Sequence, residues 1–93
     1  MTEATSITLE RIHTEGEYTL YELKATATDG ETITIPTANT QITTSTVVQL
    51  VACNNVTDGT HATSCVYSDT NRQFTYVESG ASDEDVRILF YAN

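Results

Sequence analysis

The chain has 93 residues and a formal net charge of −9 at pH 7, from 13 acidic and 4 basic side chains. This length suits one small domain with a thin core, and a hydrophobic fraction of 39% is typical of a globular protein rather than of a disordered tail. A charge this negative disfavours nucleic acid and anionic membranes as partners, and no apolar run approaches the ~20 residues that span a bilayer.

Threonine dominates the composition, at 19 of the 93 positions. Its β-branched side chain is stiff and suits a pleated sheet better than a helix. The composition therefore predicts an all-β protein. The opening residues, Met1 to Ser6, show no basic region followed by an apolar stretch, so we expect no signal peptide.

Short alternating runs separated by turn residues predict a single small antiparallel β-sandwich or barrel of about seven strands. We expect a flexible N-terminal arm at residues 1–5 and one β domain at residues 6–93. The expected strands are, in chain order, Ser6–His13, Glu17–Thr28, Glu31–Pro36, Thr43–Asn54, Thr63–Tyr67, Gln73–Glu78 and Asp85–Tyr91. The most apolar run, Val47 to Val51, lies in the fourth of these and is the candidate central strand.

The dipeptide Asp29-Gly30 lies between the second and third runs and predicts a hairpin. A two-residue loop would place Ile33 opposite Thr26, on the solvent face. A three-residue loop that ends at Gly30 instead pairs Ala25 with Ile33, which keeps both residues in the core. This second register is favoured, and Gly30 then takes the left-handed conformation of a β-bulge, which glycine tolerates.

The segment Val56–Thr60 predicts a second hairpin turn, and Cys53 and Cys65 flank it. If the loop is centred on Gly59, the two cysteines lie directly opposite each other, close enough for a disulfide. If Gly59 instead ends a three-residue loop, Cys65 faces Val51 and the cysteines are only diagonal neighbours. The alternative is a pair of reduced thiols that pack as small apolar residues in a protein assembled in the cytosol.

The sequence shows no arrangement of residues that indicates catalysis or a bound cofactor. Two cysteines and two distant histidines lack the spacing of a zinc site, and no serine or threonine lies in a recognisable nucleophile motif. The acidic run Asp83-Glu84-Asp85 offers carboxylates for calcium, but its spacing is not that of an EF-hand. We therefore expect a protein with no enzymatic activity, no metal and no cofactor.

The order of runs and turns between Lys24 and Tyr91 carries a resemblance. Its parts are the segment Thr28–Pro36, the valine-rich run, the aromatic run Gln73–Glu78, the loop Ser79–Asp83 and the terminal run Asp85–Phe90. This order resembles small β-sandwich structural proteins of tailed viruses, such as capsid decoration proteins and related head or tail components. The two cysteines and the pair Asn54-Asn55 are not part of that pattern.

The resemblance implies a non-enzymatic virion protein that is made in the host cytoplasm and located on the capsid surface. Its implied partners are the major capsid protein and further copies of itself, as a homotrimer. We expect the polar arm Thr2, Glu3, Ala4 and Thr5 to be disordered until a partner orders it. The alternatives are a neck, tail or fibre component of the virion, or a β module that binds calcium or carbohydrate.

Overall fold

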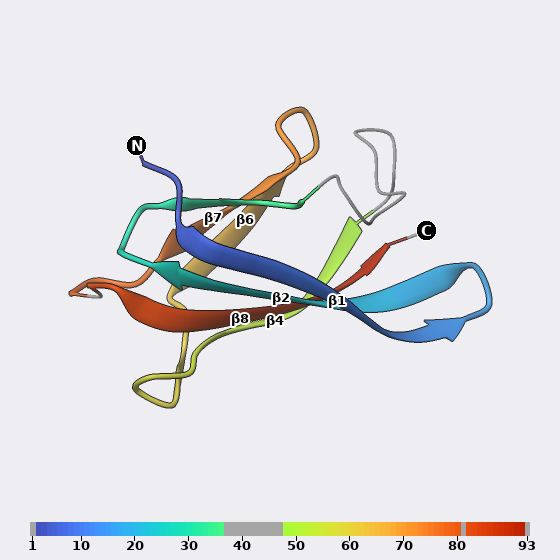
Figure 1. Ribbon diagram of the computed structural model, residues 1–93, viewed down its shortest axis with the longest axis horizontal. Helices are drawn as coiled ribbons and strands as arrows, with labels where there is room; N and C mark the ends of the chain where they lie inside the picture. The colour runs from blue at the N-terminus through green and yellow to red at the C-terminus, as the bar shows by residue number, and fades with distance from the viewer. Residues whose placement is uncertain (1, 37–47, 81, 93) are drawn as a thin grey trace.

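The computed structural model describes residues 2–36, 48–80 and 82–92 (Figure 1). The described residues form eight strands in two antiparallel sheets, which confirms the prediction of an all-β fold. The strands are β1 (Thr5–Glu15), β2 (Tyr18–Ala27), β3 (Thr32–Thr34), β4 (Val48–Asn55), β5 (Thr60–His61), β6 (Ser64–Ser68), β7 (Gln73–Val77) and β8 (Glu84–Ala92).

A five-stranded sheet, in the order β1-β2-β8-β4-β5, packs against a three-stranded sheet, in the order β3-β7-β6. The prediction that the run Val47 to Val51 forms the central strand is wrong, because β8 lies in the middle of the larger sheet and β4 lies beside it. Residues 43–47 of that predicted strand lie outside the described residues. In β8 the residues from Ile88 to Ala92 are continuously apolar, although only the inward-facing side chains of this strand are buried.

The hydrophobic core lies between the two sheets. Phe90 of β8 is fully buried, and its ring centroid lies 5.3 Å from that of Phe74 in β7 and 5.5 Å from that of Tyr21 in β2. The other buried apolar residues are Ala4, Leu23, Ala25, Ala27, Ile33, Ile35, Cys53, Tyr76, Val86, Ile88 and Ala92. Most of them alternate along β2, β3, β7 and β8, so one face of each strand supplies the core.

The turn at Gly30 connects the two sheets rather than two strands of one sheet. The Glu31 N–H donates to the carbonyl of Thr28 at 3.0 Å, and Gly30 has a φ of 86°, as the third residue of a type II turn requires. The Gly30 N–H donates to the Tyr76 carbonyl in β7 at 2.7 Å. The predicted pairing of Ala25 with Ile33 is therefore wrong. Both residues are buried as expected, but they belong to opposite sheets.

The turn before β5 is confirmed at residues 56–59, where Gly59 has a φ of 71° and its N–H donates to the Asn55 carbonyl at 2.9 Å. After β5, however, the chain leaves the larger sheet, and β6 joins the smaller one. Neither register considered for Cys53 and Cys65 therefore occurs, because the two cysteines lie on different sheets.

The N-terminal residues pair with the edge of β3, in the parallel direction. The Ala4 N–H donates to the Thr32 carbonyl at 2.8 Å, and the Thr32 N–H donates to the Thr2 carbonyl at 3.0 Å. The Glu3 carboxylate accepts from the N–H and the hydroxyl of Thr34, at 2.9 and 2.5 Å. Residues 2–4 of the expected flexible arm thus have a packing partner in the unpaired backbone groups of β3, and Thr5 begins β1, where it lies opposite Thr26.

Replacing Gly30 by valine tests the turn between the sheets. A Cβ at this position would meet nothing within 4 Å, so the cost of the substitution comes from the positive φ alone. We expect Gly30→Val to lower the free energy of unfolding by about 1–2 kcal/mol and the melting temperature by roughly 5–15 °C. The control, Gly30→Asn, should lose less because asparagine tolerates this conformation better. Equal melting temperatures for the wild type and Gly30→Val would contradict the assignment.

Candidate binding face

The side of the larger sheet that faces away from the smaller sheet carries a row of polar and basic side chains. Lys24 of β2 lies directly opposite Arg87 of β8, and Arg87 lies opposite Asn54 of β4, which pairs with His61 of β5. Residues that are directly opposed in an antiparallel sheet point to the same face. Thr8 of β1 lies opposite Lys24 and extends the row to the edge of the sheet.

Two further rows on the same side carry large apolar side chains. Leu20 pairs with Tyr91, and Leu89 lies between Glu22 and Ala52. The side chains of Leu20, Leu89 and Tyr91 are only half-buried. We use the name outer face for the surface formed by Leu20, Glu22, Lys24, Arg87, Leu89 and Tyr91. The antiparallel pattern predicts a polar surface here, so these apolar side chains depart from it.

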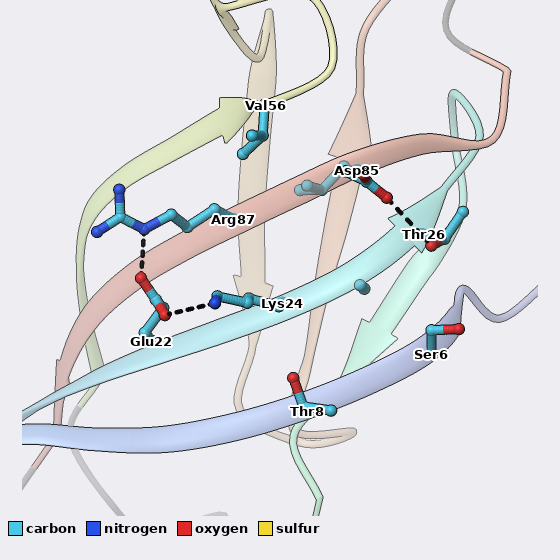
Figure 2. Close-up of a pocket in the computed structure, with 10 residues that line it drawn as sticks. Ser6, Thr8, Glu22, Lys24, Thr26, Val56, Asp85 and Arg87 are labelled. Atoms are coloured by element: carbon cyan, nitrogen blue, oxygen red, sulfur yellow. Dashed lines mark hydrogen bonds and ion pairs between the residues drawn. The ribbon is translucent and has the colours of Figure 1, made fainter.

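A three-residue ion cluster lies at the centre of the outer face (Figure 2). The Arg87 Nε–H donates to Glu22 Oε2, and the Lys24 ammonium lies 3.4 Å from Glu22 Oε1. The side chain of Glu22 is 10% exposed, whereas those of Lys24 and Arg87 are 55% and 43% exposed. Two of the chain's four basic residues thus share one carboxylate. Glu22 offsets the repulsion between the directly opposed Lys24 and Arg87.

The pKa of Glu22 reflects two opposing effects. Burial raises the pKa of the carboxyl, but hydrogen bonds and charge attraction from Arg87 and Lys24 outweigh burial, so the pKa lies below the ordinary value of 4.5. Glu22 is therefore ionised at neutral pH, and its attraction to the two cations stabilises the folded sheet.

A hollow of about 560 Å³ lies beside the ion cluster. It is bordered by Ser6 and Thr8 of β1, by residues of β2 and β8, and by Val56 in the turn that follows β4. Figure 2 shows Val56 and Thr8 on opposite sides of this hollow, with Lys24 and Arg87 between them. The side chain of Val56 is 54% exposed. The hollow thus offers hydroxyl groups, two cations, two carboxylates and the exposed apolar side chain of Val56 to a partner.

A second polar cluster joins the two sheets at the end of β4. Asn55 is fully buried, and its Nδ2 donates to Glu78 Oε2 at 2.5 Å and to Asp58 Oδ2 at 3.2 Å. Glu78 also accepts from the hydroxyls of Tyr76 and Thr60, at 3.1 and 3.0 Å. The hydrogen bond from Asn55 lowers the pKa of Glu78. The polar side chains of this cluster form hydrogen bonds with one another. This indicates that the cluster holds the two sheets together rather than acting as a reactive site.

The acidic run at Asp83, Glu84 and Asp85 does not converge on one point. The Asp83 carboxylate accepts from the Thr28 hydroxyl at 3.3 Å, and the Asp85 carboxylate lies 3.5 Å from the Thr26 hydroxyl. Within the described ranges, no group of three or more His, Cys, Asp or Glu side chains is arranged to hold a metal ion.

Residues 2–36, 48–80 and 82–92 also contain no helix long and apolar enough to cross a membrane.

Sequence reasoning missed the outer face. One signal was present, because Leu89 and Tyr91 interrupt the alternation of β8 with apolar side chains on both of its faces. The pairing of Glu22 with Arg87 had no such signal, since 65 residues separate them along the chain.

Comparisons of this chain with protein-family models, with curated proteins and with solved structures find no significant match.

Removing the charge of Glu22 tests the ion cluster. We expect Glu22→Gln to lower the free energy of unfolding at pH 7 by about 1 kcal/mol, a small value because both cations are partly exposed. Because the folded state lowers the pKa of Glu22, its contribution is complete above about pH 4.5 and is lost as the pH falls below that. The difference between variant and wild type, measured by urea denaturation, should therefore shrink in acid. Glu17→Gln, in the exposed β1–β2 turn, is the control that should change little at either pH.

Replacing Asn55 by aspartate tests the cluster between the sheets. The new carboxylate would face Asp58 and Glu78 in a buried position, which raises its pKa in the folded state. A raised pKa means that stability is lost as the pH rises above about 4, so we expect a deficit of about 3 kcal/mol at pH 7 and a smaller one near pH 4. Asn54→Asp, the neighbour beside Arg87 and His61, should be nearly neutral. A deficit of Asn55→Asp that does not vary with pH would contradict this interpretation.

Proposed function

We propose that this chain is a non-enzymatic structural protein of the virion, a decoration protein that binds the major capsid protein on the outside of the capsid and stabilises the lattice. The observation that carries the proposal is the outer face, where Leu20, Leu89 and Tyr91 stay half-exposed on a sheet whose other side forms the core. Apolar side chains grouped in this way, beside polar ones, are typical of a surface that binds another protein.

The charge distribution supports the same surface. The outer side of the larger sheet carries two basic residues, Lys24 and Arg87, and three acidic ones, Glu22, Glu10 opposite it, and Asp85 opposite Thr26. Its net charge is therefore −1. The whole chain carries −9. A protein partner can therefore approach this side of the larger sheet with little electrostatic penalty. The rest of the acidic surface makes free copies of the chain repel one another before they bind the capsid.

The edge of the larger sheet provides a route to self-association. β1 is 11 residues long, and in the described part of the chain it pairs only with β2. Its other side presents backbone N–H and C=O groups, which can pair with a strand of a second copy. This edge supports the proposed self-association, because each copy can offer its β1 to a neighbour.

Quantitative mass spectrometry on gradient-purified particles from the source culture tests the location. A decoration protein should be present in many copies per particle, comparable to the major shell protein. A few copies per particle would assign the chain to the neck, tail or fibre instead. Absence from particles would contradict any virion role, and calorimetric titration with calcium and glycans would then test the binding-module alternative.

A pair of lysine substitutions tests which surface binds. Leu89→Lys places a charge in the middle of the outer face, and we expect at least a tenfold loss of affinity for capsids that lack the protein, measured by co-sedimentation. Val66→Lys is the matched control, because Val66 is 63% exposed on the smaller sheet, so binding should be retained. Circular dichroism should show both variants folded. Unchanged binding by a folded Leu89→Lys variant would contradict the proposed surface.

A further inference from the structure

The two cysteines meet between the sheets. Cys53 of β4 pairs with Ile88, and Cys65 of β6 pairs with Tyr76; both partners are fully buried, so both cysteines point to the inner faces of their sheets. Cys53 belongs to the buried core, Cys65 packs against that core from the facing sheet, and both cysteines are free. Two cysteines on the facing inner sides of packed sheets are placed so that a disulfide can form with little movement of the backbone.

We propose that Cys53 and Cys65 are a redox site, in which a low-molecular-weight disulfide oxidises the two thiols to an intramolecular disulfide that joins the two sheets. The thiols remain reduced in a reducing cytosol, and the bond forms when the protein meets an oxidising environment. This inference does not rest on the proposed function, because it concerns the interior of the sandwich and needs no partner.

The two cysteines differ in exposure and in acidity, and this sets the order of the reaction. Cys65 is half-exposed, and the hydrogen bond from Cys53 lowers the pKa of its thiol. Cys53 is 8% exposed, and the hydrogen bond with Cys65, together with burial, raises the pKa of its thiol. The thiolate is the nucleophile in disulfide exchange, so Cys65 reacts first and Cys53 resolves the intermediate.

The exchange proceeds in two displacements. The Cys65 thiolate attacks one sulfur of the oxidant, which forms a mixed disulfide and releases a thiolate that takes up a proton. Cys53 then gives its proton to solvent, and its sulfur attacks the Cys65 sulfur; the protein disulfide forms and the second thiolate of the oxidant leaves and is protonated. Two electrons and two protons pass from the two cysteines to the oxidant, which ends as two thiols.

The position of the bond determines its effect. Between Cys53 and Cys65 the chain runs through β5 and then crosses from the larger sheet to the smaller one. A covalent link across this crossing closes a short loop and reduces the freedom of the unfolded chain. We expect oxidation to raise the melting temperature by on the order of 10 °C in a domain of this size.

The test uses the purified full chain, equilibrated in a series of glutathione buffers from fully reducing to fully oxidising. Thiol exchange is then quenched with acid, the protein is unfolded in denaturant, and its free thiols are labelled with an alkylating agent. As the buffers become more oxidising, mass spectrometry should show that the protein stays a monomer and that the number of alkylated cysteines falls from two to none. The melting temperature should rise over the same range of buffers. Two alkylated cysteines in the most oxidising buffer, a cross-linked dimer, or an unchanged melting temperature would each overturn the proposal.

Two single variants separate the roles of the cysteines. Cys53→Ala keeps the half-exposed Cys65, so it should accumulate a mixed disulfide with glutathione. Cys65→Ala keeps the buried Cys53, which should stay unmodified while the protein is folded. Neither variant should show a rise in melting temperature on oxidation. If Cys65→Ala reacts with glutathione faster than Cys53→Ala does, the assigned order of attack is wrong.

Discussion

The packing of Phe90 against Phe74 is the interaction on which the arrangement of this domain depends. The two rings bring the centre of the larger sheet into contact with the centre of the smaller one. An aromatic pair of this kind contributes about 0.5–1.5 kcal/mol beyond the burial of its surface. Because side chains alternate along a strand, placing Phe90 and Ile88 inward forces Arg87, Leu89 and Tyr91 outward. The composition of the outer face thus follows from the register of the core.

The polar connection at the end of β4 complements this core. Asn55, Glu78 and Tyr76 join the two sheets where apolar packing ends, and hydrogen bonds satisfy the buried amide. A buried amide without partners would cost about 1–3 kcal/mol, so the network specifies one relative placement of the sheets rather than adding much net stability. Cys53, two residues before Asn55, lies on the same inner face, so a disulfide there would reinforce the same junction.

The sequence predicted which segments are strands much better than it predicted how they pair. Alternation is a local property, and it identified seven of the eight strands that the described residues form. The remaining strand, β5, has two residues and is too short to produce it. Pairing is a long-range property. A hairpin at Gly30 would place Ala25 and Ile33 side by side in one sheet, whereas the observed turn places them in opposite sheets, and both arrangements bury the same residues. The pattern of burial therefore could not distinguish them. For the same reason the sequence placed Cys53 and Cys65 near each other only within one hairpin, whereas they lie on different sheets.

The edges of the two sheets show where a partner can add to the domain. The edge of β3 is covered, because residues 2–4 pair with it and Ala4 enters the core. β5 is too short to offer more than two residues, and β6 offers five. In the part of the chain that the structure describes, β1 is therefore the long edge that remains open, and it borders the outer face through Thr8.

A partner that pairs with β1 also reaches Lys24 and Leu20 on the next strand, so edge pairing and side-chain contact can act together. Since a thin-cored domain is stabilised by whatever binds only its folded state, association at this corner would support both the assembly and the fold.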